Sequence, residues 1–188
     1  MAEPNIELAD AGPVTWWRCE PRRLARDQQE VAAFCPDLDW SATGAGSWHG
    51  RLPIWPFARP KPQGVEDLVD GKGLLVQVVY GHAYPMVPAA IFPLDPEPEV
   101  VERTQHQWHV NGDGSLCLMQ TDAAWTGRDS VTGLLLKAAG WHIEYALMKH
   151  GLISVMSTNG IVEDPVVDPL IVSSAAERSV EADVPPED

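Results

Sequence analysis

The chain lacks three features that would narrow its function at once: a long hydrophobic run, a Cys-x-x-Cys pair and a glycine-rich nucleotide-binding loop. Its longest strongly apolar segments are about the length of a strand, so no membrane-spanning helix is predicted. Without paired cysteines we expect no structural zinc site, and we predict no metal or cofactor. Without a nucleotide loop, any ATP-consuming step would fall to another protein.

Basic residues are also scarce. The chain has 13 lysines and arginines against 27 aspartates and glutamates, a formal net charge of −14. From residue 163 onward, eight acidic residues and a single arginine supply −7 of that charge. This balance argues against nucleic acid as a partner. Near the N-terminus four arginines cluster, either as a solvated helix face or as a docking patch: Arg18, Arg22, Arg23 and Arg26.

Cysteines are few and odd in number: Cys19, Cys35 and Cys117. An odd count, with no recognisable signal peptide, favours a reducing, cytoplasmic location. Cys19 and Cys35 flank the first predicted helix and are interpreted as packing residues.

Helix and strand patterns follow one another in an order typical of the α+β class. Pro21 suits the first turn of a helix that must end before Pro36. The predicted elements are a helix over 21–34, strands over 39–43, 47–55, 73–80 and about 90–92, loops over 56–72 and 94–104, and a helix from 129 or 130 to about 149. The chain therefore divides into a flexible N-terminus over 1–14, one domain over 15–172 and an acidic, disordered tail over 173–188.

The candidate reactive residue is Cys117. It follows the turn-rich run Asn111-Gly112-Asp113-Gly114-Ser115, which would form an ordered loop that presents the thiol. A thiolate is the most nucleophilic side chain available near neutral pH. The alternative is a buried, inert cysteine.

Several motifs together resemble the ubiquitin-conjugating enzyme family, over about residues 20–150. The matching pieces are the strand 74–80, Tyr84-Pro85-Met86-Val87-Pro88, the segment 90–93, His109-Val110-Asn111, Gly114-Ser115-Leu116-Cys117-Leu118, Trp125 and the helix from about Ser130. The resemblance implies an N-terminal helix, an antiparallel sheet of about four strands, an irregular active-site loop and a long C-terminal helix.

The resemblance also implies a function. Cys117 would take the C-terminal carboxyl of a modifier as a thioester and pass it to a target amine. The partners would be an activating enzyme, the modifier and a target protein, with neither nucleic acid nor a membrane involved. The compact chain resembles the bacterial relatives found in antiviral defence operons, which work with ubiquitin-like proteins or with cGAS-like nucleotidyltransferases.

The loop departs from the family pattern in its spacing. In the family, the histidine and asparagine lie ten and eight residues before the cysteine, whereas His109 and Asn111 lie eight and six before Cys117. Valine also replaces the middle proline. Asn111 would therefore either donate to the oxyanion or simply form an Asn-Gly turn, and Gln107 occupies the ten-before position.

Other residues of the segment have alternative roles too. His109 would orient the loop or act as a base, and His106 is a weaker candidate for the same role. Asp122 would attract an incoming lysine or remain a solvated loop acid.

Two rival functions remain open. One is a non-catalytic binding module with the same fold. The other is a cysteine hydrolase of another fold, with His142 or His150 brought to the thiol by folding.

Overall fold

The structure, a computed structural model, describes residues 14–119 and 125–182. It contains a four-stranded antiparallel sheet with helices packed beside it, which confirms the predicted α+β class. The strands are β1 (Asp39–Ser41), β2 (Ser47–Arg51), β3 (Leu75–Val79) and β4 (Ala90–Asp95), in the spatial order β1-β2-β3-β4. The α-helices are α1 (Trp16–Cys19), α2 (Pro21–Phe34), α3 (Val65–Leu68), α4 (Val131–Lys149) and α5 (Asp168–Ala182), with 3-10 turns η1 (Val100–Glu102) and η2 (His106–Trp108).

One face of the sheet is buried and the other is partly exposed. Trp48, Val78 and Ile91 pair in register across β2, β3 and β4, and all three are buried. Their neighbours along each strand are only half-buried or exposed, as in antiparallel sheets covered on one side. The covered face therefore carries the core, against which the helices pack.

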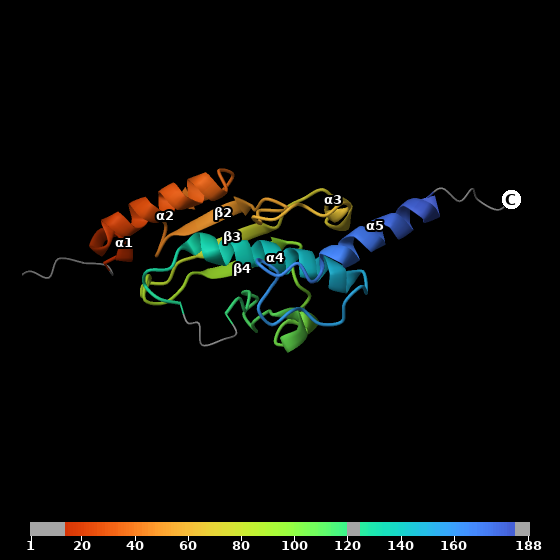
Figure 1. Cartoon of the computed structure of the whole chain (residues 1–188). Coiled ribbons are helices and arrows are strands. Elements are labelled where there is room, and N and C mark those ends of the chain that lie inside the picture. The colour runs from red at the N-terminus through yellow and green to blue at the C-terminus, as the bar shows by residue number, and fades with distance from the viewer. Residues whose placement is uncertain (1–13, 120–124, 183–188) are drawn as a thin grey trace, which may run out of the picture.

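The two predicted long helices are confirmed. The first predicted helix is α2, which begins at Pro21 as expected. The second is α4, whose capping residue Ser130 accepts a hydrogen bond from the Thr132 backbone N–H through its side chain, 3.2 Å away. Figure 1 shows α4 crossing the sheet, α2 alongside it, and α5 extending away from the rest of the molecule.

Several local predictions are wrong or incomplete. The predicted loop over 56–72 contains α3, and β4 continues past the expected 90–92 to Asp95. Pro93 is tolerated in β4 because this strand lies at the edge of the sheet. The tail expected to be disordered from 173 instead continues α5 to Ala182. The predicted N-terminal segment falls almost wholly on 1–13, outside the described residues.

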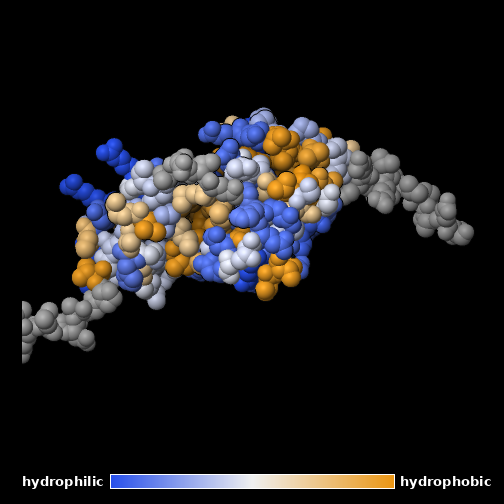
Figure 2. All heavy atoms as spheres, turned by 90° about the horizontal axis from the view of Figure 1, so that it is seen from below, coloured by the Kyte–Doolittle hydropathy of each residue, from blue (hydrophilic) through white to orange (hydrophobic). Residues whose placement is uncertain are grey.

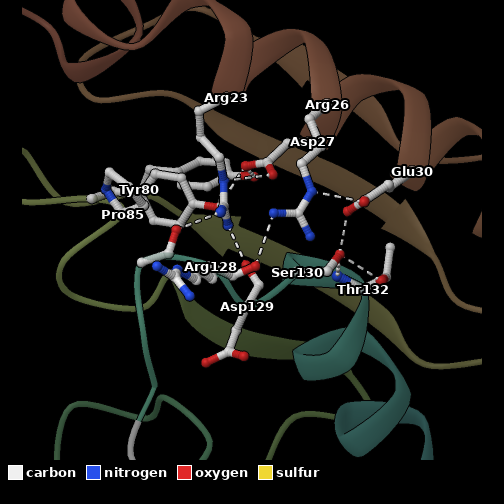
Figure 3. Close-up of polar contacts among 12 residues, drawn as sticks. Arg23, Arg26, Asp27, Glu30, Tyr80, Pro85, Arg128, Asp129, Ser130 and Thr132 are labelled. Atoms are coloured by element: carbon white, nitrogen blue, oxygen red, sulfur yellow. Dashed lines mark hydrogen bonds and ion pairs between the residues drawn. The ribbon is translucent and has the colours of Figure 1, made fainter.

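The arginine cluster is not simply a solvated face, because Arg23 is buried. Its guanidinium donates to the Tyr84 hydroxyl (2.5 and 3.0 Å) and to the backbone carbonyls of Gly127 (2.8 Å) and Asp129. Asp27, one turn along α2, forms an ion pair with Arg23 at 3.0 Å and accepts the Tyr84 hydroxyl at 2.5 Å. Arg23, Asp27 and Tyr84 thus form one group of contacts, the Arg23 cluster. Figure 3 shows how the contacts of α2 join this helix to the chain just before α4.

The surface carries apolar side chains in separate patches on the face drawn in Figure 2. Exposed apolar residues include Met86, Val87, Val100 and Val101. Among the helices in the described part of the chain, none has both the length and the apolar character needed to cross a bilayer.

Candidate active site

The cysteine segment forms a small antiparallel hairpin between β4 and α4. Val110 and Leu116 pair as an isolated β-bridge, and both side chains are buried. The backbone N–H of Cys117 donates to the His109 carbonyl (2.8 Å), and that of Leu116 donates to the Ile91 carbonyl in β4 (2.8 Å). The segment is thus tied to the edge of the sheet, with His109 opposite Cys117.

The tip of the hairpin is a closely bonded turn. The Asn111 N–H donates to the Ser115 carbonyl (2.8 Å), and the Asp113 carboxylate accepts both the N–H (2.9 Å) and the hydroxyl (2.7 Å) of Ser115. Gly114 has φ of +89°, a conformation that L side chains rarely adopt. These bonds fix the approach to Cys117, and Asn111-Gly112 is part of a turn.

The Asn111 side chain takes part in this turn through only one of its two amide protons. Its side-chain Nδ2 donates to the Ser115 hydroxyl at 3.0 Å. An amide nitrogen carries two protons, so one remains for another acceptor. Asn111 and Cys117 together line two cavities of about 240 Å³ each. The geometry is therefore compatible with both predicted roles of Asn111.

Cys117 is half-buried and borders three cavities. The other two cysteines differ from it and from each other. Cys35 is buried, its thiol donates to the Arg51 carbonyl, and burial raises the pKa of that thiol. Cys19 is exposed, so its interpretation as a packing residue is wrong.

His109 shares two of those cavities with Cys117. It ends η2 with φ of +49°, which turns the chain into the hairpin. Burial, and to a smaller degree the charge of His106, lowers the pKa of His109 below its usual value. The imidazole is therefore neutral near pH 7 and able to accept a proton.

The remaining predicted residues fall in different places. His106 and Gln107 lie on η2 and are exposed, and the Gln107 carbonyl accepts the Met156 N–H (3.2 Å). Trp125 donates through its indole to the Pro85 carbonyl at 2.6 Å, which anchors Trp125 on the Tyr84-Pro85 turn. Asp122 lies outside the described residues.

Sequence reasoning missed two residues of α4 that reach the cysteine. The Lys137 ammonium donates to the Leu118 carbonyl at 3.2 Å, next to Cys117 in the chain. Glu144 lines the same small cavity as His109 and Cys117. No motif around Lys137 or Glu144 points to the cysteine, since the two residues lie 20 and 27 positions after it in the sequence.

The histidines considered for a hydrolase lie elsewhere. His142 and His150 line a cavity with Arg51 and Asp95, and Cys117 is not among its lining residues. Within residues 14–119 and 125–182, no three His, Cys, Asp or Glu side chains are grouped to hold a metal ion. A scan against protein-family models and a search of curated proteins find no match to this chain.

Proposed function

We propose that this chain is a ubiquitin-conjugating-like transferase whose Cys117 carries an acyl group as a thioester. The acyl group is the C-terminus of a ubiquitin-like protein or of a cGAS-like nucleotidyltransferase, and the setting is bacterial antiviral defence in the cytoplasm. The observation that carries the proposal is the position of Cys117: a half-buried thiol on a tethered hairpin, bordering three cavities. An inert cysteine such as Cys35 is instead enclosed in the core.

The motifs that resemble the conjugating family support the proposal because they meet in space. The Trp125 indole bonds to the Pro85 carbonyl (2.6 Å), and the rings of Tyr84 and Trp125 lie 6.0 Å apart. Leu116 joins the hairpin to β4, the strand that follows the Tyr-Pro turn. Pieces 25 to 41 residues apart in the sequence are thus joined by direct contacts.

The proposed chemistry is two acyl transfers. In the first, the Cys117 thiolate attacks the carbonyl carbon of a thioester on the activating enzyme, and that enzyme's sulfur leaves as a thiolate. In the second, a target amine attacks the Cys117 thioester, the Cys117 thiolate leaves and the amine loses a proton. Each tetrahedral intermediate carries an oxyanion, for which the remaining Asn111 amide proton is the candidate donor.

The test is thioester capture with purified proteins. Cys19→Ser protein removes the exposed thiol that would otherwise react and serves as the parent. It is incubated with ATP and with the activating enzyme and modifier encoded beside its gene, and the products are run on gels with and without thiol reductant. A reductant-sensitive adduct is expected from the parent and none from the Cys117→Ala variant.

Two further outcomes decide the proposal. Cys117→Ser should give an oxyester that resists the reductant, because oxygen replaces sulfur at the same atom. An adduct that persists in Cys117→Ala would contradict the proposal. So would the absence of any adduct with an activating enzyme that demonstrably charges itself, and this second result would favour the binding-module alternative.

A further inference from the structure

A small cavity lies between Cys117 and α4. His109, Cys117, Glu144 and the segment 158–160 line it, and its volume is about 20 Å³. Such a volume holds about one water molecule, provided that polar partners surround it. His109 and Glu144 both line the cavity, and an imidazole and a carboxyl are groups to which a water can bond.

Glu144 is an unusual residue for its position. It lies in the buried stretch of α4 and is only 2% exposed. Among the described residues, no lysine or arginine forms an ion pair with it. Its Oε1 accepts the Ser157 backbone N–H at 2.6 Å. Burying a carboxyl without an ion-pair partner costs the fold free energy, and such carboxyls concentrate at functional sites.

The charged groups around Glu144 are consistent with a role beside the thiol. Burial raises the pKa of the Glu144 carboxyl, and the negative charge of Asp164 raises it further, while the hydrogen bond from the Ser157 backbone N–H lowers it. On the cavity side the ionisable groups are His109, Cys117 and Lys137. The carboxyl thus changes charge at a higher pH than an ordinary glutamate.

We propose that Glu144 is a positioning residue of the Cys117 site that acts through His109. The Cys117 thiol gives its proton to the neutral His109 imidazole, and the Glu144 carboxylate stabilises the resulting imidazolium across the one-water cavity. When the acyl donor's thiolate leaves, it takes this proton back from His109, so the proton count balances. The inference rests on the proposed role of Cys117 as acyl acceptor and adds the residues that prepare its thiolate.

The arrangement follows the logic of a nucleophile, a base and an acid that orients the base. The three residues come from three places in the fold: the strand after the hairpin tip, the strand before it, and the middle of α4. Cys117 and His109 are held together by their backbone bond of 2.8 Å. Glu144 is held by the packing of α4 and by Ser157.

The decisive measurement is the rate of Cys117 alkylation by iodoacetamide from pH 5 to pH 9, in Cys19→Ser protein, with no partner protein present. Modification at Cys117 is followed by mass spectrometry. Glu144→Gln keeps an oxygen that can accept the Ser157 N–H, yet it cannot ionise. We expect this variant to react about tenfold more slowly than its parent at pH 8, and the difference should shrink as the pH falls and Glu144 of the parent takes up a proton.

This dependence on pH separates the proposal from a structural role. A merely structural residue would change the rate by the same factor at every pH, or not at all, and either result would overturn the proposal. His109→Gln should reproduce the slow reaction at pH 8, and Glu144→Gln should add little to it, because the two residues act in series. Full, additive losses in the double variant would also overturn it.

The outcome is distinguishable from failure of the proposed function. Alkylation needs no activating enzyme, so a pH-dependent effect of Glu144→Gln without any thioester adduct would preserve the proton relay and reject the transferase. An adduct that forms normally, together with an unchanged alkylation profile, would preserve the transferase and reject the relay.

Discussion

The backbone N–H of Cys117 donates to the carbonyl of His109 at 2.8 Å, across the two strands of the hairpin. The two are eight positions apart in the sequence, yet they are cross-strand neighbours because hydrogen bonds close the turn at the tip of the hairpin. The hairpin therefore sets His109 beside Cys117 despite their separation in the sequence.

The first prediction concerns the second proton of the Asn111 amide. Asn111→Ala should slow single-turnover transfer of the acyl group from Cys117 to a small amine by on the order of 100-fold, the typical effect of losing one oxyanion donor. Ser115→Ala is the matched control, because it removes the hydroxyl that Asn111 bonds but leaves the amide in place. Equal losses in both variants would assign Asn111 to the turn alone.

The second prediction tests the Arg23 cluster of Figure 3. Arg23→Met leaves Asp27, which is fully buried, without its cation, and should lower the free energy of unfolding by about 3–5 kcal/mol. Adding Asp27→Asn should recover part of the loss, because it removes the uncompensated charge. The neighbouring Arg22 is exposed, and Arg22→Met should change stability by less than about 0.5 kcal/mol in the same urea titration. A small effect of Arg23→Met would contradict the cluster's structural role.

The helices that the sequence predicted correctly have their signals at their own ends. Pro21 and Pro36 bracket α2, and the Ser130 side chain caps α4. Two of the helices that it missed, α3 and α5, pack against each other. Gly64, just before α3, approaches Ala175 so closely that an added Cβ would lie 2.1 Å from the Ala175 Cβ. Such mutual burial has no local signature, so acidic composition suggested disorder instead.

The residues of the candidate site also divide into those with a local sequence signal and those without one. Cys117, His109 and Asn111 share a short segment with readable turn chemistry, and that segment was found from the sequence. Lys137 and Glu144 come from an apolar helix and reach the cysteine only because α4 packs beside the hairpin. Arg23, which looked like one of four surface arginines, is buried by contacts more than 60 residues away in sequence.

The third prediction concerns acid stability. Burial lowers the pKa of His142 from 6.5 to about 4, with Arg51 lowering it further and Asp95 opposing. Between about pH 4 and pH 6.5, the unfolded chain binds a proton at His142 that the folded protein does not bind. Stability from this residue is therefore complete above pH 6.5 and falls as the pH drops toward 4, by up to about 3 kcal/mol.

His142→Gln should flatten this part of the pH–stability curve, measured by urea unfolding at pH 4.5, 5.5 and 7. The exposed His150, which lines the same cavity, gives the matched control, and His150→Gln should leave the curve unchanged. An unaltered slope in His142→Gln would show that the acid sensitivity arises from other groups.

The last prediction sets stability against reactivity at Glu144. Burial raises the pKa of this carboxyl, so the folded protein retains a proton that the unfolded chain has already lost above about pH 4.5. Stability from this residue therefore falls as the pH rises through that window, and it is lowest once the folded carboxyl ionises. Glu144→Gln should raise the free energy of unfolding by on the order of 1 kcal/mol at pH 8 and leave it nearly unchanged at pH 4.5.

The exposed Glu163 offers a control whose change to Gln should have no effect at either pH. A Glu144→Gln protein that is less stable than its parent at pH 8 would mean that the carboxylate is well compensated in the fold. A gain in stability at the pH where alkylation slows would instead show that the carboxylate is kept at a cost to the fold, as expected of a residue that serves the thiol.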